Sequence, residues 1–403
     1  MNKNSKLYCV WADSGLALHN SGRTLLCCHS RKYLQDESGK DIYLHTHALD
    51  QSLDSPTRLE IQQALEAGEQ HWNCQACWDE ESAGRDSRRI VSNRINRDVD
   101  VSGRNPKLLD LKLGNTCNLA CRHCWPEVSS KWVKDFYEIA VRKTGQSYPE
   151  YLARWDSIQK SYDRENEPLW TQLKEYVDGA EYIDVYGAEP MLLHRLWEIL
   201  GYSVESGHSR HQSIHVNTNG TIWNPRYIAI LEQFRHAQID LSIDGTDAHF
   251  DYIRYGEPWS VMAENLDRYK AWSEQHSNVN ICVCITVFAL NVWYLPELYR
   301  FFRDRHIGVF FNFLHMPEYL NLKAFPEPVK QAILEKLDSA VIDSRWGQEI
   351  AAVKNFLMDT ARDGEKQWQD FCRNTDHLDQ LRSQSFADTF PEFWSVVKPY
   401  WTQ

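Results

Sequence analysis

The sequence predicts an α/β protein built around a parallel sheet. From residue 106 onwards, apolar runs of strand length alternate with longer stretches in which apolar residues recur at helical spacing. Strands that alternate with helices are typical of right-handed βαβ units. The 403 residues, 42% apolar and 25% charged, also suit a globular chain of more than one domain. We therefore expect a partial (β/α)6 barrel or an open doubly wound sheet, with functional loops at the carboxyl ends of the strands.

Residues 1–105 are expected to form a small N-terminal α+β domain and a connector. Short apolar runs predict strands at 7–11 and 24–28, separated by a turn region at 15–22, and Pro56 begins a predicted helix that ends near residue 67. Charged residues crowd together between residues 79 and 100, which predicts either a solvated connector or an arm packed over a neighbouring region.

The core domain is predicted over 106–320 and a C-terminal helical region over 321–403. A stretch at 126–179 is aromatic and charged without a strand pattern, so we expect it to be a helical insertion. The six predicted strands are 108–113, 182–186, 213–217, 238–243, 279–287 and 309–314, and the predicted helices between them include 192–203, 225–234, 260–274 and 296–303.

Charge and hydropathy exclude several classes of protein. The 44 Lys and Arg residues face 56 Asp and Glu residues, a formal charge of −12 that disfavours bulk nucleic-acid binding. The mean hydropathy is −0.57. The longest apolar stretch, 281–290, is too short to cross a bilayer, so no membrane partner is expected. The N-terminus has no apolar signal-peptide core, which predicts a cytoplasmic protein.

Eleven cysteines are an odd number for a disulfide framework in a reducing compartment, and thiolate ligands explain them better. Cys117, Cys121 and Cys124 follow the first core strand. Three thiolates at this spacing can surround one face of a cubic 4Fe-4S cluster and leave the fourth iron without a protein ligand. A zinc site would need a fourth ligand, and His123, between two would-be ligands, is not expected to reach the same metal.

The pattern Cys117-x3-Cys121-x2-Cys124 resembles the signature of the radical S-adenosylmethionine (radical SAM) superfamily. Further motifs similar to those of that family follow in order near successive strand ends. Each motif alone is weak, since Asn-Gly and Asp-Gly are ordinary turn signals, and their common order makes the resemblance specific. They are Tyr186-Gly187-Ala188-Glu189-Pro190, in which Ala188 replaces a glycine, Asn217-Thr218-Asn219-Gly220, Leu241-Ser242-Ile243-Asp244-Gly245 and Tyr252-Ile253-Arg254.

The resemblance implies a 4Fe-4S cluster whose open iron chelates the amino and carboxylate groups of S-adenosylmethionine. One electron then cleaves the S–C5′ bond, and the 5′-deoxyadenosyl radical abstracts hydrogen from a substrate. An external donor such as flavodoxin or ferredoxin is implied as the source of that electron. The implied cofactor contacts are His123 near adenine, Gly187, Ala188, Glu189 and Pro190 around the methionine amino group, and Ser242 and Arg254 near the ribose and carboxylate. Asn217 and Asp244 are further implied contacts.

A second group of cysteines lies near the N-terminus. The spacing Cys9-x12-Gly22-x4-Cys27 resembles the first half of the SPASM or twitch auxiliary-cluster module. In that family the module follows the barrel, whereas here it would precede it. Cys74 and Cys77 can supply two further thiolates, which would complete a second 4Fe-4S cluster with a relay or structural role. Zinc remains the alternative, because four thiolates suit it equally well. Cys28 is expected to be a spare.

The substrate class is left open by the residues. By analogy with relatives that carry auxiliary clusters, we expect a peptide or protein side chain. A small molecule, a nucleoside or a cofactor precursor is the alternative within the same chemistry. A noncatalytic iron-sulfur or zinc protein, acting in binding or electron transfer, is the alternative outside it, although such a protein would not need the four strand-end motifs.

Overall fold

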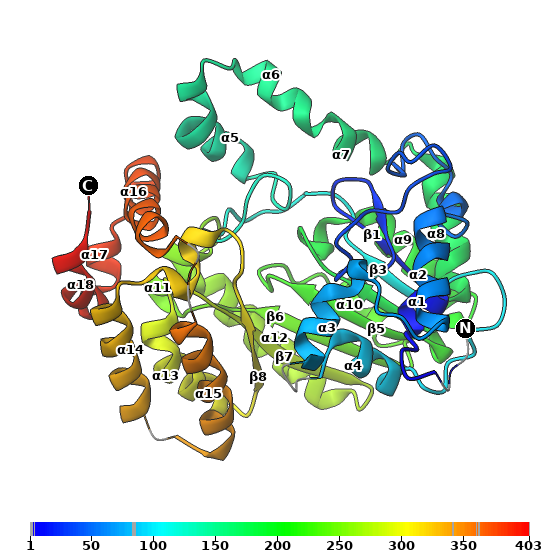
Figure 1. Ribbon diagram of the computed structural model, residues 1–403. Coiled ribbons are helices and arrows are strands. Elements are labelled where there is room, and N and C mark those ends of the chain that lie inside the picture. Colours follow the sequence, from blue (N-terminus) through cyan, green and yellow to red (C-terminus); the bar gives the residue numbers. More distant parts are fainter. Residues whose placement is uncertain are drawn as a thin grey trace.

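The computed structural model describes residue 3 and residues 5–82, 86–340, 342–359, 361 and 363–402. The described strands form one sheet in the order β2-β1-β3-β4-β5-β6-β7-β8 (Figure 1). The six predicted core strands are all present and parallel, and they pair in chain order. Because this order has no reversal point, it excludes the doubly wound alternative. They are β3 (Leu108–Leu111), β4 (Tyr182–Val185), β5 (Ser213–Thr218), β6 (His236–Ser242), β7 (Val279–Val287) and β8 (Gly308–Phe313).

The two faces of the core sheet differ in polarity. Along β5, Ile214 and Val216 are buried, whereas His215 and Asn217 are only half-buried on the other face. The apolar face packs against helices, for example α12 on β7 and α13 on β8. The opposite, inner face carries polar side chains that a ligand could reach. The crossover helices, as predicted, are α9 (His194–Glu205), α10 (Pro225–Leu231), α12 (Trp259–Gln275) and α13 (Leu295–Arg303).

The N-terminal region departs from the prediction. The strand expected at 7–11 is wrong, because Cys9 caps helix α1 (Val10–Ser14), and the expected turn region contains strand β1 (Gly15–Leu18). β1 pairs in parallel with β3 and antiparallel with β2 (Thr24–Leu25), so this region extends the core sheet. All four residues of β1 are buried, and a short apolar run without alternation gives no signal that separates strand from helix.

Three further helices complete the N-terminal region. Helix α2 (Pro56–Glu66) begins at Pro56, as predicted. The charged stretch is not a free connector: α3 (Gln75–Ser82) and α4 (Arg88–Ile95) are held together by the Arg89 guanidinium, which binds the Glu81 carboxylate at 2.6 Å. Arg88 of α4 also binds Asp184 of strand β4 at 3.0 Å, so the arm packed over a neighbouring region is the correct alternative.

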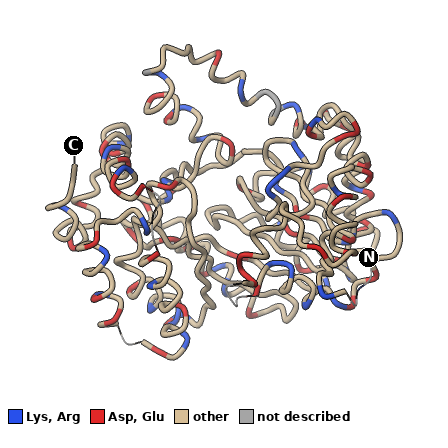
Figure 2. The backbone as a smooth tube through the Cα atoms, viewed as in Figure 1, with Lys and Arg blue, Asp and Glu red and all other residues tan. Residues whose placement is uncertain are grey.

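The insertion and the C-terminal region are helical, as expected. In Figure 1 the helices α5, α6 and α7 form an arch that stands away from the sheet before α8 returns to it. The tube in Figure 2 shows charged residues distributed along the C-terminal helices. Among the described residues, no helix combines the length and apolar character that a bilayer crossing requires. The elements are α5 (Trp132–Phe136), α6 (Tyr148–Leu152), α7 (Asp156–Ser161) and α8 (Glu167–Gly179), then α14 (Glu327–Ser339), α15 (Ser344–Met358), α16 (Gly364–Arg382), α17 (Phe386–Thr389) and α18 (Pro391–Val397).

A network of charged groups crosses the inner face of the sheet. The His215 imidazole lies between two carboxylates, with Nδ1 2.8 Å from Asp184 and Nε2 2.7 Å from Asp240. The Arg88 guanidinium of α4 reaches Asp184 at 3.0 Å and Asp110 at 3.3 Å. These pairs meet the requirement that buried charges have partners, and they attach the N-terminal region to the core strands.

Removal of the His215 imidazole should destabilise the fold in a pH-dependent way. Burial alone would lower the pKa of His215, but the hydrogen bonds to Asp184 and Asp240 outweigh it and raise the pKa to about 10. The stabilisation is therefore complete below the unfolded-state pKa of about 6.5 and is lost as the pH rises towards 10. We expect His215→Gln to lower the free energy of unfolding by about 3 kcal/mol at pH 6, because two buried carboxylates lose their partner.

Urea unfolding followed by circular dichroism at pH 6 and pH 9 measures this difference. The control is His208→Gln, since His208 is half exposed beside Asp178 and its loss should change stability by less than about 0.5 kcal/mol. A deficit for His215→Gln of the same size at both pH values would contradict the assignment of a charged imidazole.

Candidate functional site

The loop that carries Cys117, Cys121 and Cys124 lies directly beyond the carboxyl end of β3 and is held by backbone pairing. The amide of Ala120 donates to the Tyr255 carbonyl at 2.7 Å, and that of Arg122 donates to the Ile253 carbonyl at 2.8 Å. Gly256 has a φ of 137°, and a Cβ there would lie 2.8 Å from the Asn118 carbonyl oxygen. Only glycine allows the two segments to approach so closely.

A tight turn brings two of the three cysteines together. The Cys124 amide donates to the Cys121 carbonyl at 2.9 Å, so the side chains at both ends of the turn converge. The sulfurs of Cys121 and Cys124 and a ring nitrogen of His123 lie within 4.8 Å of one another, and the sulfur of Cys117 lies outside this group. The expectation that His123 cannot reach the same metal is therefore wrong, since the turn folds its ring back beside both sulfurs.

Hydrogen-bond donors surround the sulfurs. The Leu119 amide lies 3.4 Å from the sulfur of Cys117, and the Arg254 guanidinium lies 4.0 Å from that of Cys121. Burial raises the pKa of the Cys117 thiol to about 12, whereas a hydrogen bond from Cys124 lowers the pKa of Cys121. The two donors stabilise the thiolate, which is the form that binds metals, whereas burial opposes it.

Asp244 and Arg254 form a buried ion pair beside the cysteine loop. The guanidinium lies 2.7 Å from one carboxylate oxygen of Asp244, and the other oxygen accepts from the Thr286 amide at 2.8 Å. The His123 ring lies 3.8 Å from the same carboxylate and meets the Phe288 ring edge-on. Burial lowers the pKa of His123 to about 4, so the imidazole is neutral at neutral pH.

The motif at the end of β4 adopts a turn with two left-handed residues, Gly187 and Ala188, with φ of 76° and 53°. The Glu189 carboxylate that follows is fully buried. It accepts hydrogen bonds from the Thr218 hydroxyl at 2.6 Å and the Asn219 amide at 2.8 Å, so it ties this turn to the end of β5. Both oxygens of Glu189 thus have partners within the chain itself, and Pro190 continues the segment as the first residue of a short 3₁₀ helix.

The remaining predicted residues occupy the neighbouring strand ends. The Ser242 hydroxyl at the end of β6 donates to the Asn217 side-chain oxygen at 2.9 Å. The side-chain amide of Asn219 donates to the side-chain oxygen of Asn118, in the cysteine loop, at 2.9 Å. All of the predicted cluster and cofactor residues of the core domain therefore lie at one end of the sheet.

One residue of this site was missed in the sequence. Arg122, between two of the cysteines, is buried and forms an ion pair with Asp379 of α16, and its guanidinium lies 3.6 Å from the Tyr252 ring centroid. A second ion pair joins Arg382 of α16 to Asp135 of α5 at 2.9 Å. Through these two ion pairs, helix α16 covers the cysteine loop. The only signal in the sequence that could have identified Arg122 is its position between two of the predicted ligand cysteines.

The four N-terminal cysteines line a second, small cavity. Cys9, Cys27 and the neighbouring pair Cys74 and Cys77 come from three segments of the chain and meet there. The pKa of the Cys9 thiol is raised to about 12, mainly by burial and secondarily by the neighbouring Cys27 thiol. Cys28 is not part of the cavity lining, in agreement with the prediction of a spare. Among the described residues, no three of these four sulfurs lie within 4.8 Å of one another.

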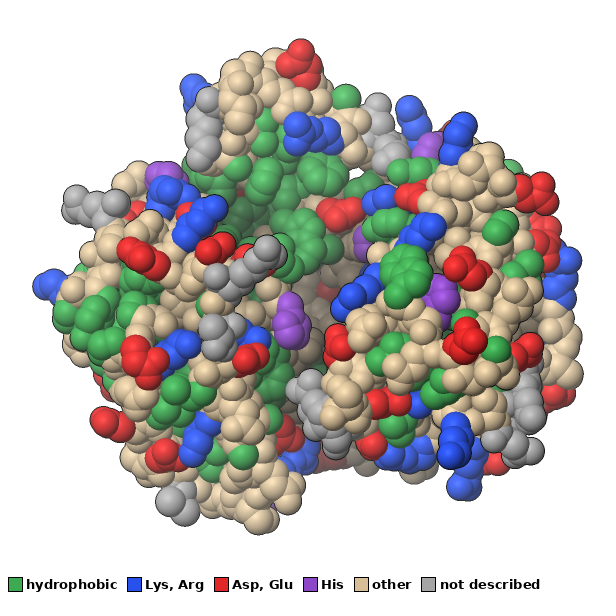
Figure 3. All heavy atoms as spheres, viewed as in Figure 1, with side chains coloured by type: hydrophobic (Ala, Val, Ile, Leu, Met, Phe, Trp, Pro, Cys, Tyr) green, Lys and Arg blue, Asp and Glu red, His purple; other side chains and the backbone are tan. Residues whose placement is uncertain are grey.

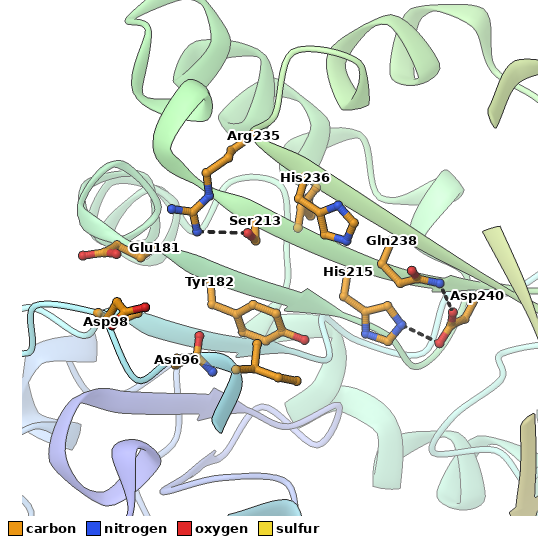
Figure 4. A pocket seen from close by; sticks show the side chains of 13 residues that line it. Asn96, Asp98, Glu181, Tyr182, Ser213, His215, Arg235, His236, Gln238 and Asp240 are labelled. Atoms are coloured by element: carbon orange, nitrogen blue, oxygen red, sulfur yellow. Dashed lines mark hydrogen bonds and ion pairs between the residues drawn. The ribbon is translucent and has the colours of Figure 1, made fainter. Parts of the chain in front are cut away.

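A cavity of about 500 Å³ lies at the opposite, amino end of strands β4 to β6. Figure 4 shows the His215–Asp240 and Gln238–Asp240 interactions among the side chains that line it, with the Arg235–Ser213 bond further along the strands. The cavity is therefore distinct from the cysteine loop, which lies beyond the carboxyl ends of the strands.

Comparisons with known proteins agree with the geometry. The mycofactocin maturase MftC of Mycobacterium ulcerans (strain Agy99) is 24% identical over 179 residues, 44% of this chain and 40% of that protein. The sporulation killing factor maturation protein SkfB of Bacillus subtilis (strain 168) is 24% identical over 179 residues, 44% of this chain and 35% of that protein. The chain thus spans less than half the length of the curated relatives it matches.

Among solved structures, native anSMEcpe with bound AdoMet aligns with a TM-score of 0.39 and 17% identity over 57% of each chain. Streptococcus suis SuiB bound to S-adenosylmethionine aligns with a TM-score of 0.36 and 13% identity over 81% of this chain and 65% of that one. The family description that matches residues 111–302 is that of the Radical SAM superfamily, and these residues contain the cysteine loop and all four strand-end motifs. Residues 111–302, a little under half of this chain, therefore contain a Radical SAM superfamily domain.

Proposed function

We propose that the protein is a radical SAM enzyme that acts on a peptide or protein side chain. The family implies a 4Fe-4S cluster and S-adenosylmethionine, and when bound these supply a 5′-deoxyadenosyl radical that abstracts hydrogen from a substrate. The observation that carries the proposal is the fixed loop at the carboxyl end of β3, where Cys117, Cys121 and Cys124 offer three sulfurs.

The residues present fit these groups. Three cysteines leave one iron of a cubic cluster free for the amino and carboxylate groups of the cofactor. Around them, His123 Nδ1 and Arg254 Nε are buried atoms without a hydrogen-bond partner. Buried polar atoms rarely stay unpaired, so these two are suited to meet a ligand. We assign His123 to the adenine, Gly187, Ala188, Glu189 and Pro190 to the methionine end, and Asn217, Ser242, Asp244 and Arg254 to the ribose and carboxylate.

An open approach to the sheet supports a peptide as substrate. Figure 3 shows a hollow between the N-terminal part and the C-terminal helices, with hydrophobic side chains gathered beneath the arch of α5 to α7. The arch carries an aromatic group in which Tyr151 contacts Tyr137, Tyr148 and Trp155. Sites for small molecules enclose most of the ligand, whereas an open apolar hollow accommodates an extended chain. The two curated relatives described above are a maturase and a maturation protein by name.

We also propose that Cys9, Cys27, Cys74 and Cys77 hold a second 4Fe-4S cluster. The four residues line one small cavity, which supports a single metal group bound by all of them. Zinc remains the alternative, because four thiolates suit it equally well. An external one-electron donor such as flavodoxin or ferredoxin completes the set of partners.

Transfer of deuterium from substrate to cofactor tests the function. A short peptide encoded beside this gene, prepared with deuterated side chains, should yield deuterium-labelled 5′-deoxyadenosine when incubated anaerobically with reduced protein and S-adenosylmethionine. Mass spectrometry of the nucleoside measures the transfer. Cofactor cleavage without deuterium transfer from any such peptide would favour the small-molecule alternative.

A further inference from the structure

Lys112 is a cation without a carboxylate partner at the edge of the proposed cofactor site. It follows β3 directly and lies two residues beyond Asp110, hence on the inner face of the sheet. The side chain is half-buried, and its Nζ lies 4.5 Å from the centroid of the Tyr186 ring. In the described part of the chain, no Asp or Glu oxygen lies within ion-pair distance of this ammonium group.

Asn20 supplies a second unpaired donor at the same place. It lies between β1 and β2, is 2% exposed, and its amide nitrogen Nδ2 is buried without an acceptor. A Cβ built on Gly187 would lie 3.3 Å from Lys112 Cγ and 3.6 Å from Asn20 Nδ2. The two side chains therefore flank the backbone of one residue in the turn assigned to the cofactor.

The nearest acid does not satisfy these donors. Asp110 lies two residues earlier on the inner face, where its Oδ2 accepts from the Tyr186 hydroxyl at 2.8 Å and pairs with Arg88 at 3.3 Å. Its Oδ1 is buried without a hydrogen-bond partner, so neither Lys112 nor Asn20 donates to it. Two donors from side chains beside the same turn residue, one of them charged and neither with an acceptor of its own, match a ligand with negatively charged oxygens.

We propose that Lys112 and Asn20 form a subsite for a carboxylate of the substrate, either an acidic side chain or a peptide C-terminus. The inference rests on the proposed function and adds the class of group that the enzyme recognises. We assign this carboxylate to the substrate rather than to S-adenosylmethionine, because Arg254 lies beyond β6, three strands away, as a cation for the carboxylate of the cofactor. The N-terminal region thus contributes to substrate selection through Asn20.

Binding of a minimal probe tests the subsite. With reconstituted protein under anaerobic conditions, N-acetylglutamate α-amide should bind about tenfold more tightly than its uncharged glutamine counterpart, as one charge-assisted hydrogen bond predicts. Saturation-transfer NMR titration measures both affinities. Lys112→Met and Asn20→Ala should remove or reduce the preference, and Lys112→Arg should retain part of it. Lys107→Met is the matched control, because Lys107 immediately precedes β3 and binds the Gly179 carbonyl instead.

Equal affinities for the two probes in the unmodified protein would overturn the inference. Lys112 could bind a carboxylate of the substrate or the carboxylate of S-adenosylmethionine. To distinguish them, the effect of Lys112→Met on the affinity for the probe is compared with its effect on the KM for S-adenosylmethionine. A larger loss for the probe supports the subsite, whereas a larger rise in the cofactor KM would assign Lys112 to the cofactor and refute it. If the unmodified protein fails to cleave S-adenosylmethionine at all, the proposed function fails, whatever the probes show.

Discussion

Replacing Cys117, Cys121 and Cys124 together by alanine should remove about four of the roughly eight irons that two cubic clusters contribute per chain. The three sulfurs lie on one loop that is fixed by backbone hydrogen bonds to residues 253 and 255, so no other described cysteine can replace them there. Colorimetric iron and sulfide analysis of anaerobically reconstituted protein measures the loss. Cys372→Ala is the matched control, since Cys372 is buried in α16 and belongs to neither cysteine group. A full iron content in the triple variant would show that the loop holds no cluster.

The same triple variant should stay brown because of the N-terminal cysteines. Iron-sulfur sites absorb visible light and become paramagnetic on reduction, whereas zinc gives neither signal. Replacing Cys74 or Cys77 by serine in the otherwise unmodified chain should lower iron content and also solubility. The physical reason is that a metal group joining three separate segments contributes much of the folding free energy of a small region.

Cys28→Ser serves as the control for these variants, because Cys28 adjoins Cys27 but does not line the cysteine cavity. It should leave iron content and solubility nearly unchanged. Absorbance, EPR of the reduced protein and metal analysis together distinguish the alternatives. A colourless triple variant that contains one zinc ion would refute the second cluster and leave the function of the core domain as proposed.

The core strands could be predicted because the apolar residues of their outer faces form short, recognisable apolar runs in the sequence. Ile183, Ile214 and Ile239 recur at the centres of separate apolar runs, and each is buried in the fold. β1 could not be predicted, because its four residues are too few to show a period and its neighbour, the apolar segment at 7–11, gave a stronger false signal.

The site was predictable where its residues are close in the chain. The cysteine spacing and the strand-end motifs are local patterns, whereas the pairs Arg122–Asp379 and His215–Asp184 join residues that are 257 and 31 positions apart. Such pairs depend on tertiary packing. The polar inner face of the sheet does have one signal in the sequence, which is a carboxylate within an otherwise apolar strand. The residues that give this signal are Asp110, Asp184 and Asp240.

Release of 5′-deoxyadenosine tests the central claim most directly. Anaerobic protein reduced with dithionite and supplied with S-adenosylmethionine should release this nucleoside slowly even without substrate, and liquid chromatography with mass spectrometry quantifies it. We predict that the triple variant at Cys117, Cys121 and Cys124 releases none. Absence of the nucleoside from fully reconstituted, reduced protein, with and without candidate substrates, would contradict the claim and favour a noncatalytic metalloprotein.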